Sequence, residues 1–235
     1  MLMPAAPAGA MSIDVSWDML SGGSPVTEHG KGFKNRLVFD EAGHRLIADG
    51  WFMDGRRGRF RSGHTGRYAG GLGICQRKAN GRNCDRDGSV NPVDNAAEPD
   101  WLLLSLDGEY QLQTLELLPA VAGDLQLSYW VGTVPADTRM KRLGYADLAA
   151  AGFGPRRDVR IAAGEPPLLD FGGALGNAVL IGGGFGGSAD AFFVQRLTVR
   201  QPVVPLPPAA LAFGSALCLL ACVRLRGPGA RRQPA

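Results

Sequence analysis

The sequence is poor in several residue types, and each shortage excludes a class of protein. Its three histidines, His29, His44 and His64, show neither the spacing of a metal-binding helix nor a G-x-S-x-G elbow, so catalysis is not expected. Charged residues make up 20% of the 235 residues and apolar residues 45%, which excludes a disordered chain and a polytopic membrane protein. Four of the 25 basic residues follow Pro205 and none of the 22 acidic ones does. The remaining chain is therefore nearly neutral, and specific nucleic-acid binding is not expected.

Glycine (34 residues) and proline (16 residues) are abundant, which favours frequent turns and disfavours a helical bundle. Short strand-forming stretches recur between these turns, and in 125–131 every second residue is apolar, the period of a strand with one buried face. We therefore predict an all-β domain over residues 12–201, a β-sandwich or jelly roll, with one helical segment at 145–151. The expected strands cover residues 12–17, 35–39, 45–52, 101–106, 112–118, 125–131, 157–161, 178–181 and 191–199.

The C-terminal segment 202–235 contains the longest uncharged stretch that is predicted to be helical, residues 209–223. A proline-rich break precedes this stretch, and the arginines that follow it favour a cytoplasmic end. Counted from Pro205, the 19 residues up to Val223 are long enough to span a bilayer. The residues that define this pattern are Val204, Pro205, Leu206, Pro207, Arg224 and Arg226.

This order of break, apolar helix and arginines resembles the PEP-CTERM sorting signal of Gram-negative bacteria in its VPLP variant. Leu206 stands where the usual triplet has glutamate. The resemblance implies processing by an exosortase, export, a transient anchor in the inner membrane and a final place at the cell surface or in the extracellular matrix. The alternative is a plain C-terminal membrane anchor.

Export requires a signal peptide, and the first residues carry part of one. Ala8, Gly9 and Ala10 fit the small-residue cleavage pattern, but no basic or long apolar stretch precedes them. We therefore interpret residues 1–11 as the end of a truncated signal peptide.

Two cysteines, Cys75 and Cys84, lie nine positions apart in a polar loop, whereas Cys218 and Cys222 lie in the apolar tail. In an exported protein two loop thiols are more often bonded than free, so we predict a disulfide between Cys75 and Cys84.

The same loop resembles the calcium loop of dockerins and EF-hands over twelve residues, with a glycine at its sixth position. The resemblance implies calcium ligands at Asn83, Asp85, Asp87 and Asp94. The alternative is a solvated, turn-rich loop, in which aspartate, asparagine and glycine are favoured in any case.

Further blocks resemble those of exosortase-dependent surface proteins, namely GGLGIC at 70–75, VDN at 93–95, DWLL at 100–103, SYWVG at 128–132 and GNA at 176–178. This resemblance implies a secreted β-rich module. It also implies that Asp94 and Asn95 matter more for the function of the protein than Asp85 or Asp87 does.

A glycine-rich segment contains five arginines and two aromatic residues. It is interpreted either as a solvated basic loop or as a surface for exopolysaccharide or another polyanion. The arginines are Arg56, Arg57, Arg59, Arg61 and Arg67.

The sequence as a whole predicts a non-catalytic, exported protein of the cell surface or extracellular matrix, associated with exopolysaccharide. The alternative is a calcium-assisted, lectin-like module at the cell surface. In that module Trp101 or Trp130 would serve as a stacking platform, whereas the simpler interpretation of both tryptophans is a buried core.

Overall fold

The computed structural model describes residues 12–202 except 21, 25, 29–35, 77–90, 97, 136–137, 139 and 186–189. Residues 12–202 belong to one compact unit. In the described part of the chain every regular element is a β-strand apart from one short 3₁₀-helix, which confirms the prediction of an all-β fold. The predicted helix at 209–223 lies outside the described residues, and no described helix is long and apolar enough to cross a membrane.

Thirteen described strands join one hydrogen-bonded network. They are β1 (Asp14–Asp18), β2 (Val26–Glu28), β3 (Arg36–Glu41), β4 (His44–Asp54), β5 (Arg59–Ser62), β6 (His64–Tyr68), β7 (Gly71–Cys75), β8 (Val93–Asp94), β9 (Asp100–Pro119), β10 (Leu125–Gly132), β11 (Arg157–Ile161), β12 (Leu168–Gly183) and β13 (Ala191–Arg200). The 3₁₀-helix η1 (Tyr145–Asp147) is shorter than the predicted helix at 145–151.

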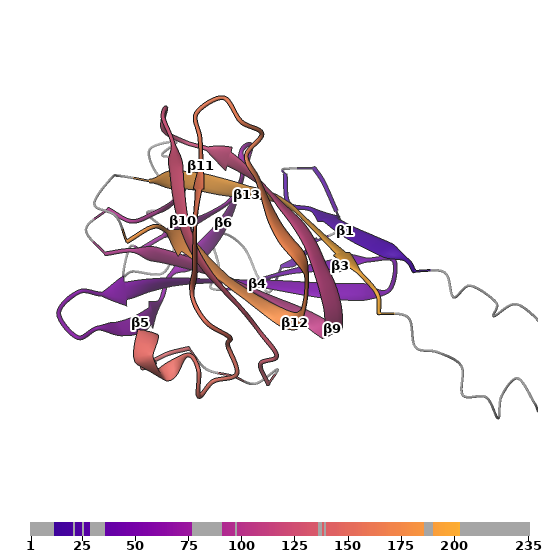
Figure 1. Cartoon of the computed structure of the whole chain (residues 1–235), viewed down its shortest axis with the longest axis horizontal. Helices are drawn as coiled ribbons and strands as arrows, with labels where there is room; N and C mark the ends of the chain where they lie inside the picture. The colour runs from indigo at the N-terminus through magenta and orange to yellow at the C-terminus, as the bar shows by residue number, and fades with distance from the viewer. Residues whose placement is uncertain are drawn as a thin grey trace, which may run out of the picture. The chain divides into compact units, whose positions relative to one another are not determined.

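Two long strands, β9 and β12, run antiparallel and side by side and connect the two halves of the network (Figure 1). The first half of β9 lies between β4 and the second half of β12. The second half of β9 lies between β13 and the first half of β12. Each long strand therefore changes its partners at its middle. The two predicted strands 101–106 and 112–118 are the two halves of β9, whereas only the second half of β12 was predicted, as 178–181.

Local interactions accompany the change of partners at the middle of each long strand. In β9 the Tyr110 hydroxyl donates to Asp107 Oδ1 at 2.8 Å and lies 2.6 Å from His44 Nδ1, so hydrogen bonds connect the side chains at this point. In β12 the register with β9 shifts between Asp170 and Ala174, as at a β-bulge. Gly172 and Gly173 occupy that shift with φ values of 65° and 72°, a left-handed conformation that L side chains rarely adopt.

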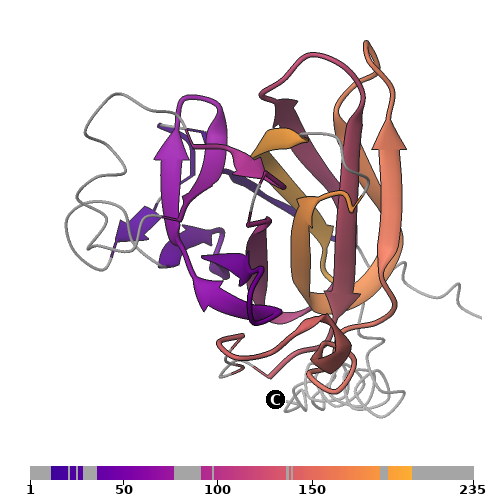
Figure 2. The same cartoon turned by 90° about the vertical axis from the view of Figure 1, so that its left-hand side faces the viewer.

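Strand β13 pairs with β1, β7 and β8 as well as with β9. At the contact with β7 the backbones are very close, because a Cβ atom built on Gly71 would lie 2.3 Å from the Val194 carbonyl oxygen. Figure 2 shows the strands of the first third of the chain, coloured indigo to purple, on one side and the orange strands on the other.

The first half of β9 is buried on both faces. Leu102 and Leu104 point into the larger apolar cluster, which we call the inner cluster, whereas Trp101 and Leu103 point into a second one, the outer cluster. The outer cluster is covered by residues 140–154, the cover segment, which inserts Met140, Leu148 and Phe153. This double burial explains the unbroken apolar run at the start of β9.

We predict that Leu103→Ala and Leu104→Ala each lower the free energy of unfolding by about 2–5 kcal/mol, because both truncations leave a cavity in a packed cluster. Urea denaturation measures the change. Leu175→Ala is the matched control, since its side chain is 56% exposed and its loss should cost within about 0.5 kcal/mol. If Leu103→Ala behaves like Leu175→Ala, then the outer face of β9 is not packed.

Candidate functional site

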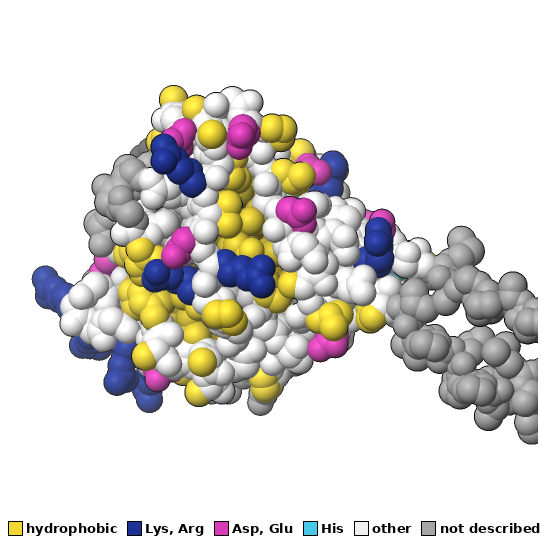
Figure 3. Space-filling view, viewed as in Figure 1, with side chains coloured by type: hydrophobic (Ala, Val, Ile, Leu, Met, Phe, Trp, Pro, Cys, Tyr) yellow, Lys and Arg dark blue, Asp and Glu magenta, His cyan; other side chains and the backbone are white. Residues whose placement is uncertain are grey.

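A pocket of about 600 Å³ gathers positive side chains at the turn between β4 and β5, and Lys and Arg side chains crowd that end of the molecule in Figure 3. We call it the basic pocket. It is lined by Asp54, Arg57, Arg59, Phe60, Arg61, Lys141 and Arg142.

One wall of the basic pocket is the β4–β5 turn, which Asp54 organises. Its Oδ1 accepts the Arg56 N–H at 3.0 Å, and its carbonyl oxygen accepts the N–H groups of Arg57 and Gly58 at 3.0 and 2.8 Å. Burial of the carboxyl opposes its ionisation, but hydrogen bonds from Arg56 and Arg61 outweigh burial and lower the pKa of Asp54. The arginine side chains of this turn, those of Arg56, Arg57 and Arg59, are exposed.

The other wall is the cover segment. The Phe60 N–H donates to the Leu143 carbonyl oxygen at 2.8 Å, and the Arg142 N–H donates to the Phe60 carbonyl oxygen at 3.2 Å. Arg142 holds a φ of 82°, a left-handed conformation that is unfavourable for a residue with a Cβ atom. The pairing with β5 therefore fixes Lys141 and Arg142 opposite the arginines of the turn, although about 80 residues separate the two walls in the sequence.

The charges of the basic pocket are unbalanced. Arg61 Nη1 lies 3.3 Å from Asp54 Oδ2, which neutralises one cation. Arg57, Arg59, Lys141 and Arg142 make no ion pair with any other described residue. Four cationic groups thus face one concave surface without a carboxylate partner there, which makes the pocket attractive to anions.

The structure changes the membership of the predicted arginine cluster. Arg57, Arg59 and Arg61 line the basic pocket, whereas Arg56 does not. Arg67 is directed elsewhere, since its guanidinium donates to the carbonyl oxygens of Met19 and Leu20 and lies over the Phe39 ring. Lys141 and Arg142 were not predicted to belong to this cluster, because they lie far from its arginines in the sequence. Their only local signal is that two basic residues stand side by side just before an apolar segment.

The two tryptophans proposed as stacking platforms are buried. Trp101 is 0% exposed and Trp130 is 5% exposed, so the interpretation as platforms is wrong and the simpler one holds. Both belong to the outer cluster, where the Trp130 ring stacks on Tyr145 with an interplanar angle of 9°. Their size and apolar character serve to fill the space between the sheet and the cover segment.

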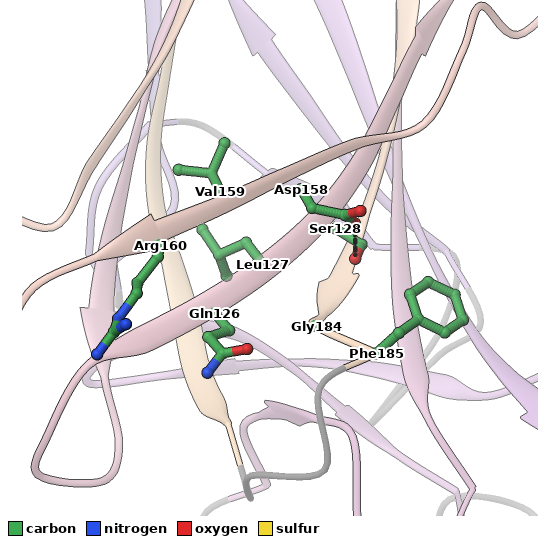
Figure 4. A pocket seen from close by; sticks show the side chains of 8 residues that line it. All are labelled: Gln126, Leu127, Ser128, Asp158, Val159, Arg160, Gly184 and Phe185. Carbon is green, nitrogen blue, oxygen red and sulfur yellow. Dashed lines mark hydrogen bonds between the residues drawn. The ribbon is translucent and has the colours of Figure 1, made fainter.

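Next to these aromatic residues lies a second pocket, of about 410 Å³, which we call the Phe185 pocket (Figure 4). The Ser128 hydroxyl donates to Asp158 Oδ1 at 2.6 Å across the β10–β11 pair. Figure 4 shows this pair between Phe185 at one end and Gln126 and Arg160 at the other. The lining residues are Gln126, Leu127, Ser128, Asp158, Val159, Arg160, Gly184 and Phe185.

Of the predicted calcium ligands, only Asp94 is described, and it lies in β8, half-buried. Its Oδ1 accepts the Ala96 N–H at 3.0 Å, and burial raises its pKa. Asn83, Asp85 and Asp87 lie outside the described residues. Among the residues that the structure describes, no group of three or more His, Cys, Asp or Glu side chains could hold a metal ion.

Asn95, the neighbour of Asp94, joins three separate elements. Its Nδ2 donates to the Gly184 carbonyl oxygen at 2.8 Å, and its Oδ1 accepts the Asp190 N–H at 2.9 Å. Asp190 Oδ1 in turn accepts the Gln126 N–H at 2.9 Å. Asn95 thus ties the end of β12 to the start of β13. The greater weight given to Asp94 and Asn95 than to Asp85 and Asp87 stays a prediction, because Asp85 and Asp87 lie outside the described residues.

Cys75 ends β7, is buried and is disulfide-bonded. Cys84, Cys218 and Cys222 lie outside the described residues, so the pairing of Cys75 with Cys84 stays a prediction. The sorting residues Val204, Pro205, Leu206, Pro207, Arg224 and Arg226 also lie outside them.

Comparison of the chain with family models, curated proteins and solved structures finds no match.

Asp100 begins β9 as a buried carboxyl. Gln76 Nε2 donates to its Oδ1 at 2.8 Å and also bonds the Glu98 carbonyl oxygen. Burial raises the pKa of Asp100 well above 3.8; the hydrogen bond from Gln76 opposes this shift and the negative charges of Asp94 and Glu98 increase it. Ionised Asp100 is therefore unfavourable in the folded state.

We predict that Asp100→Asn reduces the pH dependence of stability. Above the ordinary pKa of 3.8 the unfolded chain has lost this proton while the folded protein retains it, so the free energy of unfolding falls as the pH rises through the raised pKa. The variant should show a smaller decline from about pH 4 upward in urea titrations. Glu165→Gln, which neutralises an exposed carboxyl, should leave the slope as it is; equal slopes in Asp100→Asn and the unmodified protein would contradict the prediction.

Proposed function

We propose that this protein is a non-catalytic component of the cell surface or extracellular matrix, exported and sorted by an exosortase, that contacts acidic exopolysaccharide through its basic pocket. The domain would act as a sandwich-like β-module, with the inner cluster between its two layers. The sorting pattern at 204–226 supports the export part of this proposal, and the basic pocket supports the polyanion part.

The observation that carries the polyanion part is a set of four cations around one concave surface, Arg57, Arg59, Lys141 and Arg142, none of which forms an ion pair with another described residue. Guanidinium groups match carboxylate and sulfate oxygens in a planar, two-point geometry. Backbone hydrogen bonds join the two walls that carry the cations, so the spacing of the two backbones is set before a ligand arrives, which lowers the entropy lost on binding. An acidic polymer supplies several anionic groups in a row, which suits a pocket of this breadth better than one small ion does.

We expect the triple variant Arg57→Gln, Arg59→Gln, Arg142→Gln to bind dextran sulfate and polygalacturonate at least about tenfold more weakly than the unmodified protein. Removing three contacts to sulfate or carboxylate groups should also make the dependence of affinity on salt shallower, because fewer counterions are released. Biolayer interferometry over a series of NaCl concentrations measures both quantities.

The matched control removes the same three charges from ion-paired surface arginines. Arg45, Arg196 and Arg200 pair with Asp40, Glu116 and Asp14 outside the basic pocket. Their replacement by glutamine should change the affinity much less. An equal loss in both triple variants would show that net charge alone governs binding, and the absence of binding to either polymer would reject the polyanion part of the proposal.

The sorting part has its own test, the intact mass of the protein recovered from the envelope and medium of its native host. We expect a species that lacks roughly the last 30 residues, because a sorting signal is removed after export. Replacing Pro205 and Pro207 by alanine should leave the tail attached. A full-length species in the cytoplasm of the unmodified host would contradict sorting and leave the polyanion measurement unaffected.

A further inference from the structure

We propose that the Phe185 pocket binds a neutral saccharide unit, without calcium. This inference goes beyond the proposed function, since it concerns a different site and an uncharged ligand. It is carried by three properties of the pocket: each of its charged side chains is ion-paired with a neighbour, some of its hydrogen-bonding groups have no partner among the described residues, and an aromatic ring is exposed in it.

The charged groups around the Phe185 pocket neutralise one another. Asp158 Oδ2 lies 3.1 Å from Arg156 Nη2, while its Oδ1 accepts the Ser128 hydroxyl. Arg160 is paired with Asp124 through Nε, at 2.8 Å, and through Nη2. The pocket therefore lacks the charge excess of the basic pocket and has no electrostatic reason to select an ion.

Several hydrogen-bonding positions remain open in the pocket. The Gln126 side-chain amide makes no hydrogen bond with the other described residues, which leaves two donors and an acceptor. The Asp158 carboxylate is 56% exposed and can accept more bonds than the two it makes. Arg160 adds a largely exposed guanidinium. Sugar hydroxyl groups both donate and accept, so a mixed set of this kind suits them.

The Phe185 ring supplies an apolar surface at one end of the pocket. It is 48% exposed although its neighbours fix its position: the Tyr145 ring lies 5.1 Å away, the Trp101 ring 5.8 Å away, and the Arg156 guanidinium 4.5 Å from its centroid. An exposed ring held in this way loses little entropy when a ligand covers it. The C–H face of a pyranose can lie on the part of the ring that Arg156, Trp101 and Tyr145 leave exposed, while its hydroxyls reach Asp158 and Gln126. A volume of about 410 Å³ is within the range of small-molecule sites.

The test is affinity electrophoresis of the full chain in gels containing dextran, laminarin or galactomannan, with EDTA present. We expect at least one of these neutral polysaccharides to retard the unmodified protein. Phe185→Ala should weaken that binding by about tenfold, because the stacking surface is lost. Gln126→Ala, a surface change that leaves the aromatic cluster intact, should weaken it by a smaller factor. Salt at about 0.5 M should have little effect, since the ligand is neutral.

Leu175→Ala is the matched control, because it truncates a similarly exposed apolar side chain outside the pocket, and it should be retarded like the unmodified protein. The basic-pocket triple variant should also retain this binding, which separates the two proposals. The inference is overturned if none of the three polysaccharides retards the protein, if retardation requires added calcium, or if the Phe185→Ala and Gln126→Ala variants are both retarded as strongly as the unmodified protein.

Discussion

The double burial of β9 at Trp101–Leu104 is the constraint on which the rest of the structure depends. A strand without contact to water on either face cannot leave backbone groups unpaired, so it needs a hydrogen-bonded neighbour on each side. Strands β4 and β12 are these neighbours. The outer face also needs an apolar cover. Without one, Trp101, Leu103 and Leu180 would form an exposed apolar patch, although the backbone of the strand already has its hydrogen-bonded neighbours.

Both candidate sites follow from the way in which that cover is held. The cover segment buries Met140, Leu148 and Phe153, and its link to β5 brings Arg142 to the β4–β5 turn. Tyr145, which also belongs to the cover segment, contacts Phe185 of the other pocket. The rings of Phe60 and Phe185, which line the two pockets, both contact Tyr145, at 5.6 and 5.1 Å. The two pockets are therefore linked through one aromatic cluster, in which Tyr145 contacts a lining ring of each.

The sequence predicted those parts of the fold whose signals are local. The bounds of β11 at 157–161 were predicted correctly, and those of β10 within one residue, because turn residues delimit both strands. The stretches 101–106 and 112–118 were predicted as two strands, but they are the two halves of the single strand β9, which pairs with β12 on both sides of Asp107 and Gly108. The hairpin of β6 and β7 was missed because its glycines have poor strand propensity, although Gly71 is needed where β7 meets Val194.

The site was harder to predict because it depends on long-range pairing. Three of the five arginines of the segment 56–67 do line one pocket, but nothing local shows that Arg67 points toward Met19 or that Lys141 and Arg142 join the others. The two interpretations of the tryptophans, buried core and stacking platform, stayed open for a related reason: a tryptophan in a strand has the same sequence signal whether its face is open or covered. Only the cover segment decides this, so Trp101 and Trp130 are buried while Phe185, beyond the end of β12, remains exposed.

The two pockets differ in the range at which they can act. Unpaired cations attract an acidic polymer over about one Debye length, roughly 8–10 Å in physiological salt, so the basic pocket would govern the rate of association. Paired charges and an exposed ring act only at contact, so the Phe185 pocket would govern how long a sugar unit stays bound. On a polysaccharide that alternates acidic and neutral units, the two proposed sites on one domain would hold the polymer jointly, because binding at one would raise the effective concentration at the other. Such a division suits a matrix component, which must retain a long, repetitive polymer without reading any single unit of it with high affinity.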